Sequence, residues 1–356
     1  MKILILTTAI TDSGGVSSIL CQKANALSNI SGIEIAIAST NDFQEELFFG
    51  IEEKVHLYFL KTKMKHLLSL QDFYNELKNV IGKFQPDVIS VADNGLKSFF
   101  VKRMFPNLPV VYEIHANEEV LYSGGKTGIP SKITSWISKS LLPSFDQIVI
   151  QNRKFNLPKN THSTYIPNFI SKSEEISFSP SNKIIAVGRV VSTKNYLLLL
   201  EIWEEITAVF PEKELHIFGS WDDDDLVKKI RKVTQVFLHQ PTVNISDIYK
   251  DAYVLLHASY IESFPMVFLE AMFYGVPVVC FDVNQPELVL HDKTGFVVKK
   301  NDKEMFIKYV FDLIKNPDRR TKCSEQSMEY SKQFSKENIV TQWVNLFQEV
   351  IKNKKD

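Results

Sequence analysis

Cysteine and long hydrophobic runs are both scarce in this chain of 356 residues. The three cysteines, Cys21, Cys280 and Cys323, lie far apart, with no pair at metal-ligand spacing. The sequence therefore excludes a disulfide framework and favours a reducing compartment. The apolar run after Lys2 is too short for a signal peptide, and no run approaches the roughly 18 apolar residues that cross a bilayer. We expect a cytoplasmic protein, with peripheral attachment at the inner face of a membrane left open.

Charge of one sign is not in excess either. Lysine and arginine number 41 against 42 for aspartate and glutamate, a formal net charge of −1, so we expect no nucleic acid among the partners. The hydrophobic share of 44% and the charged share of 23% are typical of a folded globular protein. Because 356 residues exceed what one hydrophobic core usually serves, the length predicts two domains.

Short runs rich in isoleucine and valine alternate with helical patterns in both halves of the chain. Their continuous apolarity predicts parallel strands covered on both faces. The recurring strand–helix order predicts an α/β fold made of two doubly wound, Rossmann-like domains. The predicted strands are Ile3–Leu6, Ile33–Ala38, Val88–Val91, Val110–Ile114 and Ile148–Ile150 in the first half, and Ile184–Val187, Leu215–Phe218, Val236–Leu238, Val254–Leu256 and Val276–Phe281 in the second.

A stretch rich in serine, proline, asparagine and glutamate around residues 167–183 has the weakest pattern for regular structure. We place a linker there, at residues 169–182, between an amino-terminal domain of residues 1–168 and a carboxyl-terminal domain of residues 183–335. Residues 336–356 carry apolar side chains at helical spacing. They predict a final helix, which docks either on the carboxyl-terminal domain or back on the amino-terminal domain.

Two glycines, Gly14 and Gly15, follow the first predicted strand and precede a helical run. Glycines at such a turn let the backbone approach a ligand closely at the positive end of a helix. The third glycine of a dinucleotide-binding fingerprint is absent here. A helix cap and a flexible turn are the alternative interpretation.

A second candidate site follows the strand predicted over Ile184–Val187. Arg189 comes directly after Gly188, and Lys194 lies five positions further on. Arginine presents a planar fork to phosphate and lysine a compact, mobile charge. The carboxyl end of a strand is where an α/β domain holds its ligand, so the pair suits a diphosphate. Two solvated surface charges are the alternative.

The segment from His257 to Val279 contains two carboxylates, Glu262 and Glu270, on either side of Pro265. Pro265 fits the first position of a helix, which places Glu262 in the preceding loop and Glu270 in the second turn. The helix N-terminus suits an anion, and ionised carboxylates accept hydrogen bonds from the hydroxyls of a sugar or ribose. Alternatively, Glu270 only complements the helix dipole and Glu262 is a solvated loop charge.

Taken in order, these segments resemble glycosyltransferase family 4, whose members are retaining enzymes of GT-B architecture with two Rossmann-like domains facing an interdomain cleft. The resemblance runs from about residue 14 to about residue 298. It departs from the family at Ser263, where glycine is common. The matching elements are Gly14-Gly15-Val, the strand Val110–His115, Gly188-Arg189 with Lys194, Glu262-x7-Glu270 with Phe264-Pro265, Pro286-Glu-Leu and Thr294-Gly-Phe-Val.

The resemblance implies a role for each matching residue. Arg189 and Lys194 would hold the diphosphate of a nucleotide sugar, and Glu270 would bind its ribose. Glu262 would contact the transferred sugar, and His115 would lie near the reacting centre, so these two are the expected catalytic residues. The remaining residues expected to bind the donor are Gly14, Gly15, Ser263, Phe264, Pro265 and Met266.

The implied activity is transfer of a sugar, with retained anomeric configuration, from a nucleotide-diphosphate donor to a glycan or lipid-linked glycan. UDP-sugars are the first choice of donor and GDP-mannose is the competitor. A hexosyl- or N-acetylhexosaminyltransferase in surface polysaccharide or lipopolysaccharide biosynthesis is expected. The alternative is a non-catalytic glycosyltransferase-like subunit that partners another enzyme. The sequence does not predict an oligomeric state.

No metal or other cofactor is expected. Asp222–Asp225 open a predicted helix, where acidic side chains satisfy the helix dipole. His239 follows a predicted strand and is the candidate for contact with the nucleobase. Lys61, Lys63, Lys65 and His66 form a basic cluster, interpreted as a solvated face, with contact to a membrane or a lipid diphosphate as the alternative.

Overall fold

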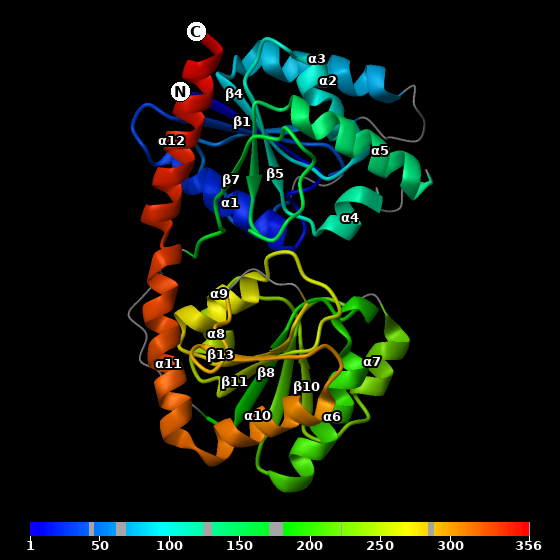
Figure 1. Cartoon of the computed structure of the whole chain (residues 1–356), viewed down its shortest axis with the longest axis vertical. Coiled ribbons are helices and arrows are strands. Elements are labelled where there is room, and N and C mark those ends of the chain that lie inside the picture. The colour runs from blue at the N-terminus through cyan, green and yellow to red at the C-terminus, as the bar shows by residue number, and fades with distance from the viewer. Residues whose placement is uncertain are drawn as a thin grey trace. The chain divides into compact units, whose positions relative to one another are not determined.

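The computed structural model describes residues 1–42, 46–61, 69–123, 130–170, 181–221, 223–283 and 288–355, and the chain divides into two compact units. Unit 1 comprises Met1–Phe169 together with Lys336–Asp356, and unit 2 comprises Ile170–Ser335. Figure 1 shows a twisted sheet flanked by helices in each unit. Most of the predicted linker, residues 169–182, lies outside the described residues.

Unit 1 is built on a seven-stranded parallel sheet with the order β3-β2-β1-β4-β5-β6-β7. The central strands β4 and β5 are buried along their whole length, which explains their uninterrupted apolar sequences. The strands are β1 (Lys2–Thr7), β2 (Glu34–Ser39), β3 (His56–Phe59), β4 (Val88–Ala92), β5 (Val110–Ile114), β6 (Gln147–Ile150) and β7 (Ser163–Tyr165).

The helices of unit 1 include the last helix of the chain. α12 packs against α1 and β4, and its Trp343 lies over the ammonium group of Lys23 on α1. These contacts attach residues 336–355 to unit 1. The helices are α1 (Gly15–Ser28), α2 (Ser69–Phe84), η1 (Leu96–Phe100), α3 (Val101–Met104), α4 (Glu118–Ser123), α5 (Ser131–Leu141), η2 (Leu142–Ser144) and α12 (Lys336–Lys355).

Unit 2 contains a six-stranded parallel sheet with the order β10-β9-β8-β11-β12-β13. Its helices are η3 (Ser192–Lys194), α6 (Tyr196–Val209), α7 (Asp224–Ile230), α8 (Ser246–Tyr249), α9 (Met266–Phe273), α10 (Lys303–Lys315), α11 (Pro317–Ser331) and η4 (Lys332–Phe334). Its strands are β8 (Lys183–Val187), β9 (Glu214–Phe218), β10 (Val236–His239), β11 (Val254–His257), β12 (Val278–Phe281) and β13 (Gly295–Val298).

Both sheets are doubly wound, which confirms the predicted fold class. In unit 1 the strand order reverses between β1 and β4, and in unit 2 it reverses between β8 and β11. Three strands, β3, β7 and β13, were absent from the prediction. β3 and β7 are short and lie at the two sheet edges with no buried residue, so neither shows a continuous apolar run.

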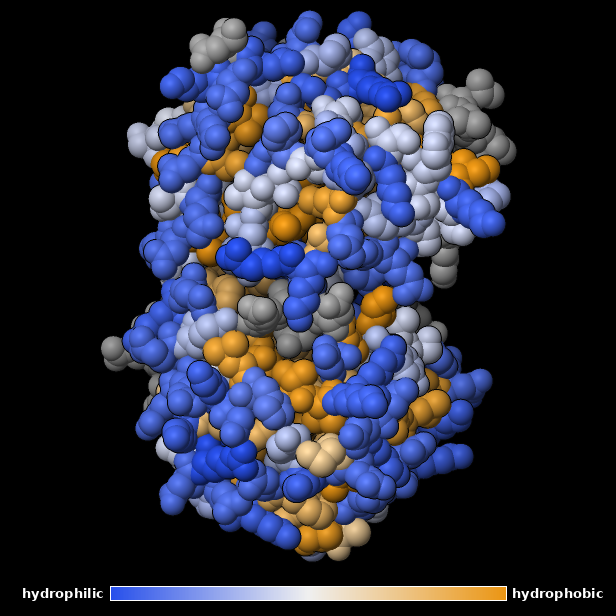
Figure 2. All heavy atoms as spheres, viewed as in Figure 1, coloured by the Kyte–Doolittle hydropathy of each residue, from blue (hydrophilic) through white to orange (hydrophobic). Residues whose placement is uncertain are grey.

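The described helices include none with the length and apolar character needed to cross a membrane. Figure 2 shows hydrophilic side chains over much of the surface that faces the viewer in each unit, with smaller hydrophobic patches between them. The three cysteines are buried and unbridged, as the wide spacing in the sequence predicts.

Candidate functional site

The candidate residues of unit 2 meet where its strand order reverses. β9 and β10 lie on one side of β8, and β11 to β13 lie on the other. Strands at such a point leave room for a ligand at their carboxyl ends. Arg189 and Lys194 follow β8, whereas His257 ends β11 and Glu262 comes shortly after it. The fold therefore brings the two motifs of the carboxyl-terminal half to one edge of one sheet.

Glu262 is the centre of a three-residue contact. Its Oε1 accepts a hydrogen bond from Nζ of Lys194 at 2.5 Å and another from Nε2 of His257 at 2.7 Å. The side chains of Glu262 and His257 are 10% and 4% exposed, whereas that of Lys194 is 24% exposed. The carboxylate of Glu262 is thus mostly buried in unit 2, whereas the side chain of Lys194 is partly exposed to solvent.

The protonation states of this cluster follow from burial and charge. Burial would raise the pKa of Glu262, but the hydrogen bond from His257 and the charge of Lys194 outweigh it and hold that pKa well below its ordinary value. Burial lowers the pKa of His257 in spite of the neighbouring carboxylate. At neutral pH Glu262 is therefore ionised and His257 is neutral, with its proton on Nε2 facing the carboxylate.

Two glycines shape the turns beside this cluster. Gly188 and Gly219 follow β8 and β9 with φ of +145° and +156°. A Cβ atom on Gly219 would lie 2.1 Å from the carbonyl oxygen of Gly188, closer than side chains approach a backbone atom. Only glycine fits at position 219, so the two turns stay in contact and fix the backbone from which Arg189 projects.

Arg189 is exposed, and its side chain makes no hydrogen bond or ion pair with any residue that the structure describes. It stands three residues before the single turn of η3 that ends at Lys194. An exposed guanidinium and a half-buried ammonium group therefore follow the same strand. Together they offer a bidentate donor and a compact charge to an anionic ligand.

Two buried polar side chains in the neighbouring loops lack hydrogen-bond partners among the described residues. They are the amide nitrogen of Asn195 and the hydroxyl of Ser259, on residues 5% and 2% exposed. The main-chain N–H of Tyr260 donates to the carbonyl of Thr193 at 2.9 Å, which joins the two loops. Buried polar groups are almost always paired, so a ligand or water is expected to complete this region.

Glu270 lies in α9 and accepts a hydrogen bond from the hydroxyl of Tyr249 at 2.8 Å. Burial raises the pKa of Glu270, and the hydrogen bond from Tyr249 opposes part of that rise. α9 begins at Met266, with Pro265 as its N-cap, so the prediction that Pro265 is the first helical residue was one position early. No side chain caps this helix, which leaves its N-terminal N–H groups available to an acceptor.

The residues between Glu262 and α9 differ in exposure. Ser263 is half-buried, whereas Phe264 and Met266 are 8% and 9% exposed. Their side chains pack into unit 2, so a ligand would contact this segment mainly through its backbone.

His239 ends β10, two strands away from β8. Its Nε2 contacts Nδ1 of His216 at 2.9 Å, and its ring stacks on that of Phe218 with centroids 4.4 Å apart. Burial, followed by the neighbouring charges of His216 and Lys183, lowers the pKa of His239. The ring is therefore neutral at pH 7 and belongs to an aromatic stack along the edge of the sheet.

The other predicted residues lie in unit 1. His115 follows β5, and both of its ring nitrogens are engaged: Nε2 contacts Oε2 of Glu113 at 3.1 Å, and Nδ1 contacts the amide nitrogen of Gln151 at 2.9 Å. Glu113 also receives hydrogen bonds from Lys23 and from Ser90. The amide of Gln151 donates to Nδ1, which leaves Nε2 to donate to Glu113.

The carboxyl group of Glu113 is ionised in this network. Burial would raise its pKa, but the charge of Lys23 and the hydrogen bond to His115 lower the pKa to about 2. The side chains of Glu113, Lys23 and His115 are 1%, 2% and 4% exposed. His115 is therefore held from both sides by buried partners.

The glycine turn of unit 1 contains its own acceptor. Gly14 is the N-cap of α1, and its N–H donates to Oδ1 of Asp12 at 2.8 Å. The same oxygen accepts from the hydroxyl of Ser17 at 2.6 Å. A carboxylate thus already occupies part of the positive end of α1, next to Gly15.

Four partners of the candidate residues were not predicted from the sequence: His257, Tyr249, Glu113 and Gln151. Each acts through a contact with a residue of another element or of the following loop. For His257 a signal exists in the sequence, because it directly follows the strand predicted over Val254–Leu256 and comes five residues before Glu262. Nothing in the local sequence connects Tyr249 with Glu270 across 21 residues.

Several predicted features fall outside the described residues. These are Pro286 of the motif that follows β12, Asp222 at the start of the acidic run, and Lys63, Lys65 and His66 of the basic cluster. In the part of the chain that is described, Asp223 caps α7 by accepting from the N–H of Leu226 at 3.0 Å. No group of three or more metal-ligating side chains comes together within that part.

Comparison with known proteins connects this geometry to a family. Residues 169–330 match the family model described as glycosyl transferases group 1. An uncharacterized glycosyltransferase of Haemophilus influenzae is 25% identical over 361 residues, which cover 96% of this chain and 98% of that protein. The amylovoran biosynthesis glycosyltransferase AmsD of Erwinia amylovora is 23% identical over 96% of this chain and 98% of its own length.

Solved structures agree with the chain over nearly its full length. Sucrose-phosphate synthase from Thermosynechococcus elongatus matches with a TM-score of 0.82 at 17% identity, covering 99% of each chain. TarM of S. aureus, in a complex that contains UDP, matches with a TM-score of 0.79 at 14% identity, covering 97% of this chain and 99% of that one. These likenesses confirm the GT-B fold.

Proposed function

The chain belongs to the glycosyl transferases group 1 family through residues 169–330, and from this premise we propose that it transfers a sugar from a nucleotide-diphosphate donor with retention of anomeric configuration. The proposed donor is a UDP-sugar. The proposed acceptor is a glycan or a lipid-linked glycan of a surface polysaccharide. Transfer of a hexosyl or N-acetylhexosaminyl group is part of the same proposal.

One observation carries this proposal: the contact of Lys194 with Glu262 beside the exposed Arg189, at the edge where β8 and β11 end. Two cations of different geometry suit the two phosphates of a diphosphate leaving group. Negative charge grows on that group as the sugar departs, so fixed cations stabilise the transition state more than the ground state.

The carboxylates bind hydroxyl groups in this proposal. Glu262 is ionised and has a second oxygen beyond Oε1, the oxygen that receives Lys194 and His257, and it accepts from a hydroxyl of the transferred sugar. Glu270 binds the ribose with the carboxyl oxygen that does not contact Tyr249. Main-chain groups of Ser263 to Met266 complete the donor contacts, and the ring of His239 contacts the nucleobase by stacking.

In the proposed reaction, the bond between the anomeric carbon and the phosphate oxygen breaks while the acceptor oxygen bonds to the same face. The acceptor proton passes to the departing phosphate, so neither Glu262 nor Glu270 carries it. His115 lies near the donor sugar and acts by contact, because Glu113 and Gln151 occupy its two ring nitrogens. Gly14 and Gly15 line the acceptor side.

Two comparisons support the finer parts of the proposal. TarM, which this chain resembles in fold, was solved with UDP, and this supports uracil as the base of the donor. AmsD takes part in the biosynthesis of amylovoran, which supports a polysaccharide as the product. We also propose a cytoplasmic location for the protein, since its proposed substrates are nucleotide sugars.

A thermal-shift screen with UDP, GDP, ADP and CDP, without added metal, tests the donor site. We expect UDP to raise the melting temperature, because a ligand that binds only the native state stabilises it. Arg189→Ala and Lys194→Ala should remove the shift, whereas Lys250→Ala, which removes an exposed lysine on another loop of unit 2, should keep it. NMR of the product then assigns its anomeric configuration.

The outcomes separate the competing functions. A shift with GDP alone would replace the proposed donor by GDP-mannose. Binding of UDP without transfer to any acceptor would favour a non-catalytic subunit that partners another enzyme. No shift with any of the four diphosphates, in protein that melts cooperatively, would contradict the donor site itself.

A further inference from the structure

The α4–α5 hairpin of unit 1 exposes three large apolar side chains. Trp136 is 70% exposed, Ile133 is 49% exposed and Val120 is 44% exposed. Among the described residues, Trp136 is the most exposed of all large hydrophobic side chains. Burying such surface is the dominant driving force of association, so a tryptophan left in water at the surface points to a partner.

The helix α5 holds two of these residues, Ile133 and Trp136, on one face. Thr134, Ser138 and Leu141 are buried, whereas Ile133 and Trp136 project outward three positions apart. Side chains three and four positions apart are neighbours on a helix surface. Lys132 and Lys139 are exposed, four positions before Trp136 and three after it, so they flank the indole on the same face. We call Lys132, Ile133, Trp136 and Lys139 the Trp136 face.

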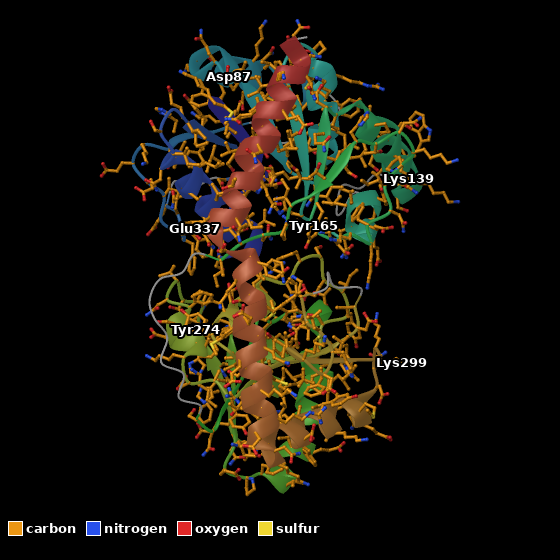
Figure 3. All side chains as sticks on the ribbon, turned by 60° about the vertical axis from the view of Figure 1, so that its left-hand side comes forward. Asp87, Lys139, Tyr165, Tyr274, Lys299 and Glu337 are labelled. Atoms are coloured by element: carbon orange, nitrogen blue, oxygen red, sulfur yellow. The ribbon has the colours of Figure 1, made fainter. Side chains whose placement is uncertain are left out.

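Tyr122 on α4 contacts α5 at two points. Its carbonyl accepts a hydrogen bond from the hydroxyl of Thr134 at 3.2 Å, and its ring lies 4.8 Å below the ammonium group of Lys139. Figure 3 labels Lys139 on α5, at the margin of unit 1. Because the two helices are tied together by these contacts, the exposed apolar residues belong to a preformed surface.

The surroundings of the Trp136 face are basic. The loop after β6 packs on α4 through Phe155, whose ring lies 6.2 Å from that of Tyr122, and through Asn156. This loop adds three exposed cations, Arg153, Lys154 and Lys159. With Lys132 and Lys139 they make five cations, against the two carboxylates of α4, Glu118 and Glu119, and Glu118 already accepts a hydrogen bond from the N–H of Asn156. The region is thus positive although the whole chain has a net charge of −1.

We propose that the Trp136 face docks on the surface of a bilayer that contains anionic lipid. Tryptophan prefers the boundary between headgroups and acyl chains, where its ring is half apolar and half wet. Lysine side chains extend their charged ends to the lipid phosphates while their stems cover apolar surface. A protein partner fits less well, because the cores of protein interfaces are depleted in lysine. Docking does not depend on the proposed transfer reaction, so the two proposals can fail separately.

Binding to vesicles tests this proposal directly. The full chain is mixed with vesicles of phosphatidylcholine alone or with one quarter phosphatidylglycerol, and the bound fraction is measured by flotation. We expect binding to the anionic vesicles, about tenfold weaker binding for Trp136→Ala, and a similar loss for Lys132→Gln/Lys139→Gln. Val243→Ala, at a 62% exposed position of unit 2, is the matched control and should bind as the wild type does.

Tryptophan fluorescence adds a readout at the proposed contact. Trp203 and Trp343 are buried and Trp221 is half-buried, so Trp136 is the indole whose surroundings a bilayer would change most. We expect a blue shift with anionic vesicles, which Trp136→Ala abolishes. If UDP binds, an unchanged thermal shift of Trp136→Ala with UDP would show that this variant is folded. If UDP does not bind, an unchanged melting temperature would show the same.

Three outcomes would overturn the proposal. The first is that the wild type does not bind anionic vesicles. The second is that Trp136→Ala binds them as well as the wild type does. The third is that the wild type binds vesicles without phosphatidylglycerol as well as it binds anionic vesicles. A concentration-dependent dimer that Trp136→Ala disrupts, without any vesicle binding, would instead assign the face to a second copy of the chain.

Discussion

Nζ of Lys194 and Oε1 of Glu262 lie 2.5 Å apart, although 68 positions separate the two residues in the chain. The contact joins the loop after β8 to the loop after β11 and aligns a cation with an ionised carboxylate. In the proposed reaction the two residues have different roles. Lys194 is expected to act on the diphosphate and Glu262 on the sugar.

Replacing each residue of this pair should therefore affect a different step. Lys194→Met should weaken UDP binding by about 10- to 100-fold, since a hydrogen bond to a charged group contributes roughly 1.5–3 kcal/mol. Glu262→Gln keeps the shape of the side chain and should leave UDP affinity unchanged or higher, while transfer falls by about 100-fold. Calorimetry with UDP and a transfer assay measure the two effects. Equal loss of UDP affinity in both variants would contradict the division of roles.

The proposed contact of Glu270 with the ribose can be tested by a thermodynamic cycle that combines a variant of the protein with an analogue of the ligand. Glu270→Ala should weaken binding of UDP by about tenfold and leave that of 2′,3′-dideoxy-UDP nearly unchanged, because the analogue lacks the hydroxyls that the carboxylate accepts. Tyr249→Phe, which removes the hydrogen bond to Glu270, should show a smaller effect in the same direction. If both ligands lose affinity equally, Glu270 acts on the fold of the site and not on the ribose.

The close approach at Gly219 predicts a large effect for a single methyl group. Gly219→Ala would place Cβ at 2.1 Å from a backbone oxygen, and we expect a loss of about 3 kcal/mol or more in the free energy of unfolding. A Cβ atom on Gly82 in α2 would meet no neighbouring group within 4 Å, so Gly82→Ala should stabilise the protein by up to about 1 kcal/mol. Denaturant unfolding measures both. An unchanged midpoint for Gly219→Ala would mean that the two turns separate easily.

The buried pair of Lys23 and Glu113 predicts a dependence of stability on pH. The pKa of Glu113 is lowered to about 2, below its ordinary value of 4.5, so between these values the unfolded state binds a proton that the native state does not. The stabilisation is therefore fully present above pH 4.5 and is lost as the pH falls to about 2, by about 3 kcal/mol. Fluorescence of Trp343, which covers Lys23, reports this unfolding.

Variants of the pair provide the control for that measurement. Glu113→Gln should flatten the acid dependence relative to the wild type, but it leaves the ammonium group of Lys23 buried without its counter-ion and should cost about 3–5 kcal/mol at pH 7. The double variant Lys23→Met/Glu113→Gln should be more stable than Glu113→Gln alone. A double variant that is less stable would show that the pair stabilises through packing and not through charge.

The fold was largely readable from the sequence because buried parallel strands have a local signature. Runs such as Val110–Ile114 are apolar at every position but one, and the structure shows β5 at these residues. The short edge strands β3 and β7 were not readable, since they lack buried residues. The order of Arg189, Lys194, Glu262 and Glu270 along the chain likewise predicted a site at the carboxyl ends of two strands.

The sequence by itself determined which chemical groups this protein has and at which strand ends they stand, because strand periodicity and turn residues act over a few positions. Only the tertiary structure decided their partners: His257 and Lys194 on Glu262, Tyr249 on Glu270, and Glu113 and Gln151 on His115. Sheet order, and not sequence distance, sets which strand ends are neighbours. The protonation of Glu262 and Glu113 then follows from burial and from cations supplied by distant segments.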